Sequence, residues 1–172
     1  MRAYPVTGGF TIEGVPPGRY VALAAFETDG LVRDPDTSIG GTMIVHFEVP
    51  AAGGPVDLGD GFKVTAALAV IAPGADGLEV VPATDPTFEW EDDSSEDGYE
   101  LRVFDAFGVM VHENTAIPSV SGSGNVTYTW TGAALEPGMV YQFRVLSFRE
   151  PPAGMRTYIS ATEDLLGAFE VE

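Results

Sequence analysis

The chain has 172 residues, of which 26 are Asp or Glu and only 8 are Lys or Arg, so its formal net charge is −18. Such acidity repels the phosphates of nucleic acids and of anionic lipids and argues against both as partners. Because the chain has no cysteine, a disulfide framework, a thiolate metal site and a cysteine nucleophile are excluded. No apolar run approaches the roughly 20 residues that span a bilayer, so we expect no membrane insertion by this segment.

Short apolar runs with a period of two, separated by Gly and Pro, predict strands and almost no helix. Residues 19–27 are apolar on both faces, which predicts a central strand covered on both sides. In residues 42–49, Val45 and Phe47 alternate with more polar neighbours, as in a half-buried strand. Residues 62–70 form a third long alternating run.

The turn signal Pro73-Gly74 after this run predicts a domain boundary, with domains at residues 1–74 and 75–172. The first half has 8 acids and 4 bases, net −4, and the second has 18 acids and 4 bases, net −14. We expect strands in the second half at residues 78–81, 87–91, 99–105, 109–112, 126–130, 139–148 and 168–171. Seven short strands are typical of an immunoglobulin-like sandwich. The sequence therefore predicts an all-β protein with two tandem antiparallel β-sandwich domains, prealbumin-like and then immunoglobulin-like.

A motif in the second half, residues 135–145, has the spacing Leu-x-Pro-Gly-x-x-Tyr-x-Phe-x-Val. It resembles the tyrosine corner of fibronectin type III domains, and the likeness covers nearly all of residues 76–172. The resemblance implies that the Tyr141 hydroxyl bonds back to the chain near Leu135 and fixes the entry to a strand. The residues that carry this signature are Trp90, Leu135, Pro137, Gly138 and Tyr141.

In the first half, residues 9–20 contain the turn Val15-Pro16-Pro17-Gly18. This segment resembles the middle of carboxypeptidase regulatory-like (transthyretin-like) domains, in which two strands flank a tight Pro-Pro-Gly turn. In that family several strands come before the segment, so the resemblance implies a partial β-domain with an unpaired edge that invites a strand from elsewhere. The residues expected at this strand-exchange edge are Phe10, Ile12, Tyr20, Val45 and Phe47.

Residue types that could support catalysis are sparse. The only imidazoles are His46 and His112, each within or at the end of a predicted strand. No Gly-x-Ser-x-Gly, no Gly-rich phosphate loop and no paired-His metal motif is present. We therefore expect no enzymatic activity and no cofactor. An enzyme that depends on either histidine ranks last among the alternatives.

The acidic run at residues 91–98 lies between two predicted strands and ends in Gly. Calcium takes several carboxylate and carbonyl oxygens from such loops, although the regular Asp-x-Asp-x-Asp-Gly spacing is absent here. One interpretation is a structural calcium site formed by Asp92, Asp93, Glu96 and Asp97. The other is a solvated loop that serves solubility.

Aromatic side chains outside the predicted core are the candidates for carbohydrate binding, because aromatic faces stack on sugar rings. Phe104, Phe107 and Phe148 are out of phase with the core residues of their strands, which predicts that they are exposed. Single exposed aromatics also occur in many proteins without a binding role.

Tandem modules of these two kinds resemble parts of exported bacterial surface proteins or lipoproteins. The resemblance implies an extracellular or cell-surface location and a noncatalytic structural or adhesion role. A leading domain without all its strands further predicts association with a protein, such as a homo-oligomer or filament, by strand addition. The alternative function is a carbohydrate- or calcium-dependent binding domain of a secreted enzyme or lipoprotein.

Overall fold

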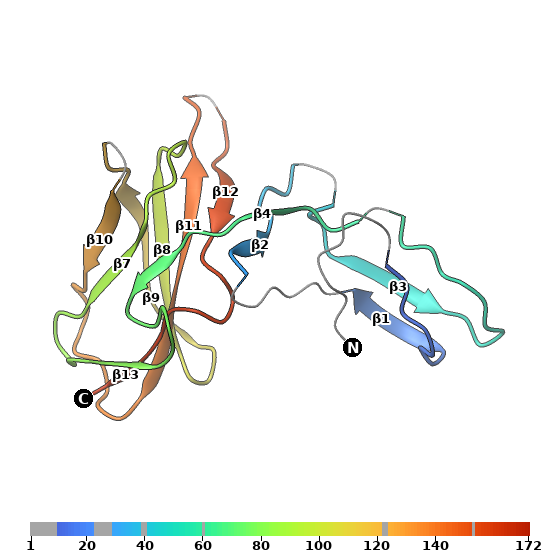
Figure 1. The fold of residues 1–172 in the computed structure, drawn as a ribbon, viewed down its shortest axis with the longest axis horizontal. Helices are drawn as coiled ribbons and strands as arrows, with labels where there is room; N and C mark the ends of the chain where they lie inside the picture. Colours follow the sequence, from blue (N-terminus) through green and yellow to red (C-terminus); the bar gives the residue numbers. More distant parts are fainter. Residues whose placement is uncertain (1–9, 23–28, 39–40, 60, 122–123, 153) are drawn as a thin grey trace.

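The computed structural model describes residues 10–22, 29–38, 41–59, 61–121, 124–152 and 154–172. This part of the chain contains thirteen strands and no helix, so the protein is all-β, as predicted. None of its segments is a helix long and apolar enough to cross a membrane. The strands form a β-sandwich, from which an arm with β1 and β3 projects (Figure 1).

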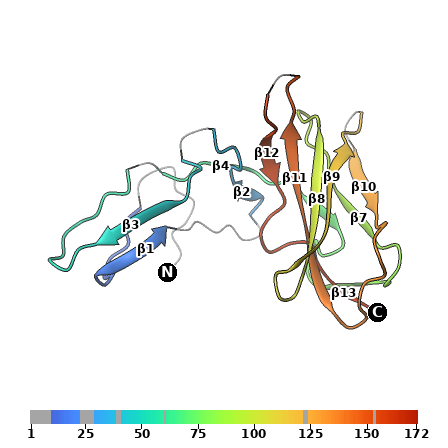
Figure 2. The same ribbon diagram turned by 180° about the vertical axis from the view of Figure 1, so that it is seen from behind.

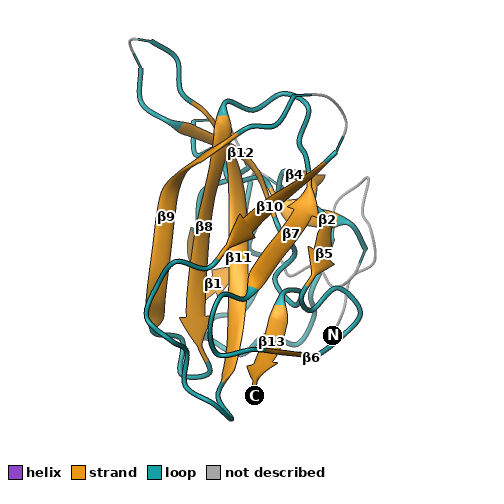
Figure 3. Ribbon diagram, turned by 90° about the vertical axis from the view of Figure 1, so that its left-hand side faces the viewer, coloured by secondary structure: helices purple, strands orange, loops and turns teal. Residues whose placement is uncertain are grey.

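The sandwich consists of two facing sheets (Figure 3). One sheet has the strand order β10-β7-β5; the other has the order β6-β13-β11-β8-β9, with β12 also paired to β11. The pairs between these strands are antiparallel except β6 with β13, which is parallel. The strands are β5 (Val70–Ala72), β6 (Glu79–Val81), β7 (Thr87–Glu91), β8 (Gly98–Asp105), β9 (Met110–Pro118), β10 (Asn125–Thr129), β11 (Val140–Arg149), β12 (Thr157–Ala161) and β13 (Ala168–Val171).

The hydrophobic core lies between these two sheets. Alternation along β7 turns Phe88 and Trp90 inward, and neither has any exposed surface. The Phe88 ring packs against four other aromatic rings, those of Tyr128, Trp130, Phe143 and Phe169. All members of the core cluster lie between Leu68 and Val171. The core therefore belongs to the C-terminal part of the chain.

The predicted boundary at Pro73-Gly74 is wrong, because chain before it belongs to this sandwich. Strand β5 pairs with β7, and Leu68 and Val70 are buried in the core cluster. After β5 the chain crosses to the other sheet, where β6 pairs with β13. Pro73 and Gly74 are both buried at this crossing and so do not form a linker.

The bond expected of the tyrosine-corner motif is present. Tyr141 is buried, and its hydroxyl accepts a hydrogen bond of 3.1 Å from the backbone N–H of Glu136, next to Leu135. Leu135 itself lies in the core cluster. At Gly138 the backbone has φ +79°, and its N–H donates to Val171 O at 2.7 Å. The motif therefore fixes the chain as it enters β11.

The N-terminal part consists of two small antiparallel ribbons, seen from the other side in Figure 2. One ribbon joins β1 (Gly18–Ala22) to β3 (Val45–Val49), and the other joins β2 (Leu31–Arg33) to β4 (Val64–Ala66). Two ribbons are not a complete sandwich, and the predicted prealbumin-like domain is not evident among the described residues.

The second ribbon is attached to the sandwich through backbone and carboxylate hydrogen bonds. Buried Glu163 accepts bonds from the backbone N–H groups of Asp29 and Gly30 through Oε1, at 2.8 and 3.0 Å. Ser160 Oγ donates to Ala66 O at 2.6 Å, and Leu68 N–H donates to Ala161 O at 2.9 Å. These bonds hold the base of the arm against the end of β12.

Two further predictions for the first half are wrong in the described residues. Residues 10–17 form no strand, so there is no hairpin around Pro16-Pro17; β1 pairs with β3 instead. Two adjacent prolines remove two backbone donors, which disfavours a ladder there. The strand predicted at 19–27 is also not covered on both sides, because Arg19 and Val21 are exposed; residues 23–28 lie outside the described part.

Candidate functional site

The β1–β3 ribbon is a two-stranded sheet without a core of its own. None of its ten strand residues is buried; along each strand, half-buried and exposed residues alternate. Among the described residues, no third strand pairs with it. A two-stranded sheet is only marginally stable in water by itself, and a third strand or a covering layer is normally required. In the described part of the chain, the ribbon therefore has neither a third strand nor a buried residue.

One face of the ribbon is apolar and the other is polar. Tyr20 lies opposite Phe47 in the ladder, and their rings stack with centroids 5.6 Å apart. The Tyr20 hydroxyl donates to Pro16 O at 2.8 Å. On the other face, Arg19 lies opposite Glu48 and forms an exposed ion pair of 3.7 Å. The ribbon thus has the pattern of a sheet covered on one side only.

The structure places the five predicted strand-exchange residues in two groups. Tyr20, Val45 and Phe47 share the apolar face of the ribbon. Phe10 and Ile12 lie outside any strand; Phe10 stacks on Phe62 at 6.1 Å, and Ile12 is 59% exposed. Of the five residues, therefore, only those on β1 and β3 lie in a strand.

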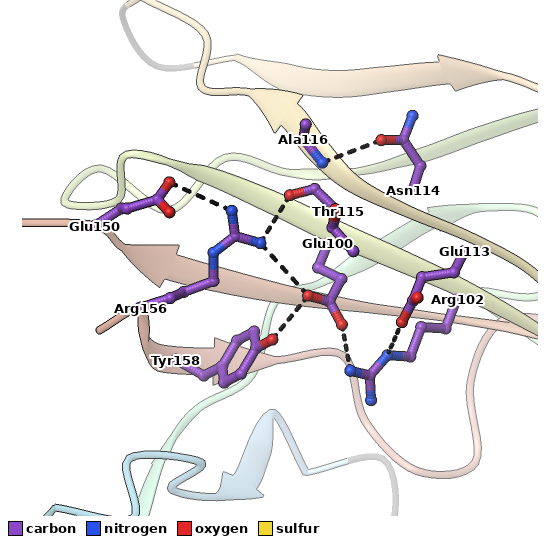
Figure 4. A network of polar contacts seen from close by, with 9 residues as sticks. All are labelled: Glu100, Arg102, Glu113, Asn114, Thr115, Ala116, Glu150, Arg156 and Tyr158. Atoms are coloured by element: carbon purple, nitrogen blue, oxygen red, sulfur yellow. Dashed lines mark hydrogen bonds and ion pairs between the residues drawn. The ribbon is translucent and has the colours of Figure 1, made fainter. Parts of the chain in front are cut away.

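The long edge strand of the sandwich, β9, is protected near its C-terminal end. Arg156 Nη1 donates to Thr115 O at 2.7 Å, and the side chain of Asn114 accepts from the N–H of Ala116 at 3.0 Å (Figure 4). Two register shifts interrupt its pairing with β8. Occupied edge groups and irregular pairing are devices that prevent strand addition. Strand addition is thus more readily accommodated by the ribbon.

Arg156 also belongs to a charged network on the outer face of the larger sheet (Figure 4). Its centre is Glu100, which is 2% exposed and forms ion pairs with Arg102 and Arg156. Tyr158 donates a hydrogen bond of 2.7 Å to the same carboxylate. Burial, and then this bond, raise the pKa of Tyr158. Among the described residues, Glu100 Oε1 is buried without a hydrogen-bond partner and is balanced only by the Arg102 ion pair, whereas Oε2 accepts the Tyr158 bond. Through Glu100 and Tyr158 the network links β8 to β12 across β11.

The acidic loop between β7 and β8 uses its carboxylates to hold itself in place. Asp92 accepts a bond of 2.7 Å from the Tyr99 hydroxyl, Asp93 accepts from Ser147 Oγ at 2.8 Å, and Asp97 accepts from the N–H of Glu150 at 2.7 Å. No group of three or more metal-ligating side chains is found in the described part of the chain. The four predicted calcium ligands therefore do not converge on one point.

Glu96 is the member of this loop whose charge is least well accommodated. Its Oε2 is buried without a hydrogen-bond partner. Burial, together with the nearby charges of Asp92 and Asp93, raises the pKa of Glu96. The loop thus has an electrostatic cost at Glu96.

The two histidines are in different environments. His46 is exposed on the polar face of β3. His112 on β9 packs its ring 4.5 Å from that of Trp130, and its Nε2 lies 3.0 Å from the Tyr128 hydroxyl. Burial lowers the pKa of His112 below the ordinary histidine value of about 6.5. His112 is a packing residue at the rim of the core.

This lowered pKa predicts that the sandwich loses stability in mild acid. Because the folded pKa lies below the unfolded one, the unfolded chain binds the proton first as the pH falls through 6.5. Urea-unfolding midpoints measured at pH 7.5 and 5.5 should therefore differ less in His112→Gln than in the wild type. His46→Gln, at the exposed histidine, should keep the full difference. Equal pH dependence in wild type and His112→Gln would contradict the prediction.

The three predicted surface aromatics do not form one platform. Phe107 is 82% exposed and Phe104 is half-buried. The prediction that Phe148 is exposed is wrong: it is 4% exposed, because the Arg156 guanidinium covers its ring at 3.6 Å and the ring lies over Gly98. Phe148 pairs with Gly98, whereas Phe104 is near the other end of β8. The described residues thus bring no two of these rings together across strands.

Comparison with protein-family models, with curated proteins and with solved structures finds no match to this chain.

Proposed function

We propose that this chain is a noncatalytic structural or adhesion module on the outside of a bacterial cell and associates with itself by strand addition at the β1–β3 ribbon. The observation that carries the proposal is the ribbon itself, a two-stranded sheet with no buried residue and no third strand among the described residues. Strand addition would supply the missing neighbour through backbone hydrogen bonds.

The sandwich supports the structural part of this proposal. Its large aromatic core is typical of a stable unit, and the Tyr141 bond and the strand order are compatible with a fibronectin type III-like module. Most of the net negative charge, −14 of −18, belongs to residues 75–172. Such charge keeps a module soluble and keeps copies from associating through their sandwiches.

Self-association can be measured by light scattering after size exclusion over a concentration series. We expect oligomers whose mass increases with concentration. Phe47→Lys, which puts a charge on the apolar face of the ribbon, should shift the protein to monomers. Phe107→Lys is the matched control, because Phe107 is an exposed aromatic of the sandwich. A wild type that is monomeric at every concentration would refute the proposal.

A further inference from the structure

The order of side chains along β3 is complementary to itself. The strand reads Val45-His46-Phe47-Glu48-Val49. If two copies of β3 pair antiparallel about Phe47, Val45 lies opposite Val49 and His46 lies opposite Glu48. We propose, building on the self-association above, that a second copy of this chain adds its own β3 in this register. The product is a four-stranded sheet with the order β1-β3-β3-β1.

This register keeps the two faces of the ribbon intact. Val45, Phe47 and Val49 are half-buried on the apolar face, and His46 and Glu48 are exposed on the polar face. In the proposed pairing each apolar residue meets an apolar residue, and each polar residue meets a polar one. A slip by one residue would turn the apolar side chains of one copy to the polar face of the other. The alternation therefore disfavours the neighbouring registers.

The edge of β1 lacks this complementarity. Antiparallel pairing of two β1 strands about Tyr20 would place Arg19 opposite Val21 and Gly18 opposite Ala22. That arrangement contains no pair of opposite charges, sets charged Arg19 against apolar Val21, and leaves Gly18 without a side chain to pack. Cross-strand pairs are the main source of specific sheet stability. The β3 edge is thus the better match for a second copy.

Charge also favours a second copy as the occupant. In the proposed sheet, Glu48 lies between Arg19 of its own chain, with which it pairs at 3.7 Å, and His46 of the second copy. The first half of the chain has a net charge of only −4, whereas the second half has −14. Contact through the projecting arms keeps the acidic sandwiches apart (Figure 1). Because the pairing is two-fold symmetric, it closes as a dimer and does not extend into a filament.

Introducing a charge at His46 tests this register. His46→Glu places two pairs of like charges across the interface, so the dimer dissociation constant measured by sedimentation equilibrium at pH 7 should rise roughly tenfold. His46→Lys should lower it several-fold, because lysine is fully charged at that pH and faces Glu48. Phe107→Glu is the control, because it makes an acidic change at an exposed residue of the sandwich.

The outcomes separate this inference from the proposed function. Opposite shifts for His46→Glu and His46→Lys, with little change in Phe107→Glu, support the β3 register. If the wild type associates but both His46 variants bind equally well or both bind more weakly, the register is wrong while self-association stands. Oligomers larger than a dimer would also overturn the two-fold register. A wild type that never associates would overturn both proposals.

Discussion

Gly74→Ala is expected to destabilise the sandwich by about 2–5 kcal/mol, which combines the strain of a left-handed backbone with overpacking. Gly74 has φ +83°, a conformation that side chains disfavour. A Cβ atom at this position would lie only 2.4 Å from both the backbone N and O of Ala168. These are backbone atoms of β13, so they cannot move aside as a flexible side chain could.

The close approach at Gly74 follows from the sheet crossing. The chain leaves β5 in one sheet and enters β6 in the other, beside β13. The N–H of Gly167, just before β13, donates to Gly74 O at 2.9 Å. Two backbones therefore meet where the sheets join, and only a residue without a side chain fits between them.

Gly138→Ala is the matched control for this prediction. Gly138 has nearly the same φ, +79°, but a Cβ there would have no atom within 4 Å. Its replacement should cost only the backbone strain, about 1–2 kcal/mol. Urea unfolding can be followed by tryptophan fluorescence, because both tryptophans, Trp90 and Trp130, are buried in the sandwich. Equal losses in the two variants would show that β13 yields to the added methyl group.

Strands with strict alternation and a covered face could be predicted from the sequence. Residues 87–91 and 168–171 form the strands predicted for them, because their inward residues, such as Phe88 and Phe169, are large and fully buried. Strand β12 was not predicted. It reads Thr-Tyr-Ile-Ser-Ala, a short run with one large aliphatic residue, and its polar Tyr158 and Ser160 bond to Glu100 and Ala66 O.

The run at residues 62–70 shows how tertiary contacts interrupt a regular pattern. Its alternation predicts one strand, but the structure has β4, a gap, and then β5. Leu68 forms a bridge with Thr162 and is buried, whereas Val64, in the same phase, is 39% exposed. The chain passes here from a two-stranded ribbon to a full sandwich. The sequence pattern does not reveal that a second sheet covers the residues after this transition but not those before it.

The candidate site was predicted in part. The alternation of β3 identified Val45 and Phe47 as one face of a half-buried strand, and they are so placed. The partner of β1 was predicted incorrectly, because the Pro-Pro-Gly segment was interpreted as a hairpin turn and β1 pairs with distant β3. A few neighbouring residues are enough to indicate a turn, but the pairing between distant strands depends on the whole fold.

Phe88→Ala is expected to cost the sandwich about 3–5 kcal/mol, the usual loss for a phenylalanine removed from a core. Phe88 has no exposed surface, and four aromatic rings surround it with centroids 5.0–6.5 Å away. Tyr128 lies on β10, Phe143 on β11 and Phe169 on β13, and Trp130 directly follows β10. Rings held by three different strands cannot all close on the cavity. Urea unfolding followed by tryptophan fluorescence measures the loss directly.

Phe47→Ala is the informative counterpart, because it removes the same ring from the arm. Phe47 is half-buried, stacks on Tyr20 and belongs to no core cluster. The free energy of unfolding of the sandwich should therefore stay within about 0.5 kcal/mol of the wild-type value. A large loss would mean that arm and sandwich unfold as one unit, so that the ribbon is already stabilised within its own chain. A negligible loss would show that the sandwich does not depend on the ribbon for its stability. We expect this result if the ribbon gains its third strand from a second molecule.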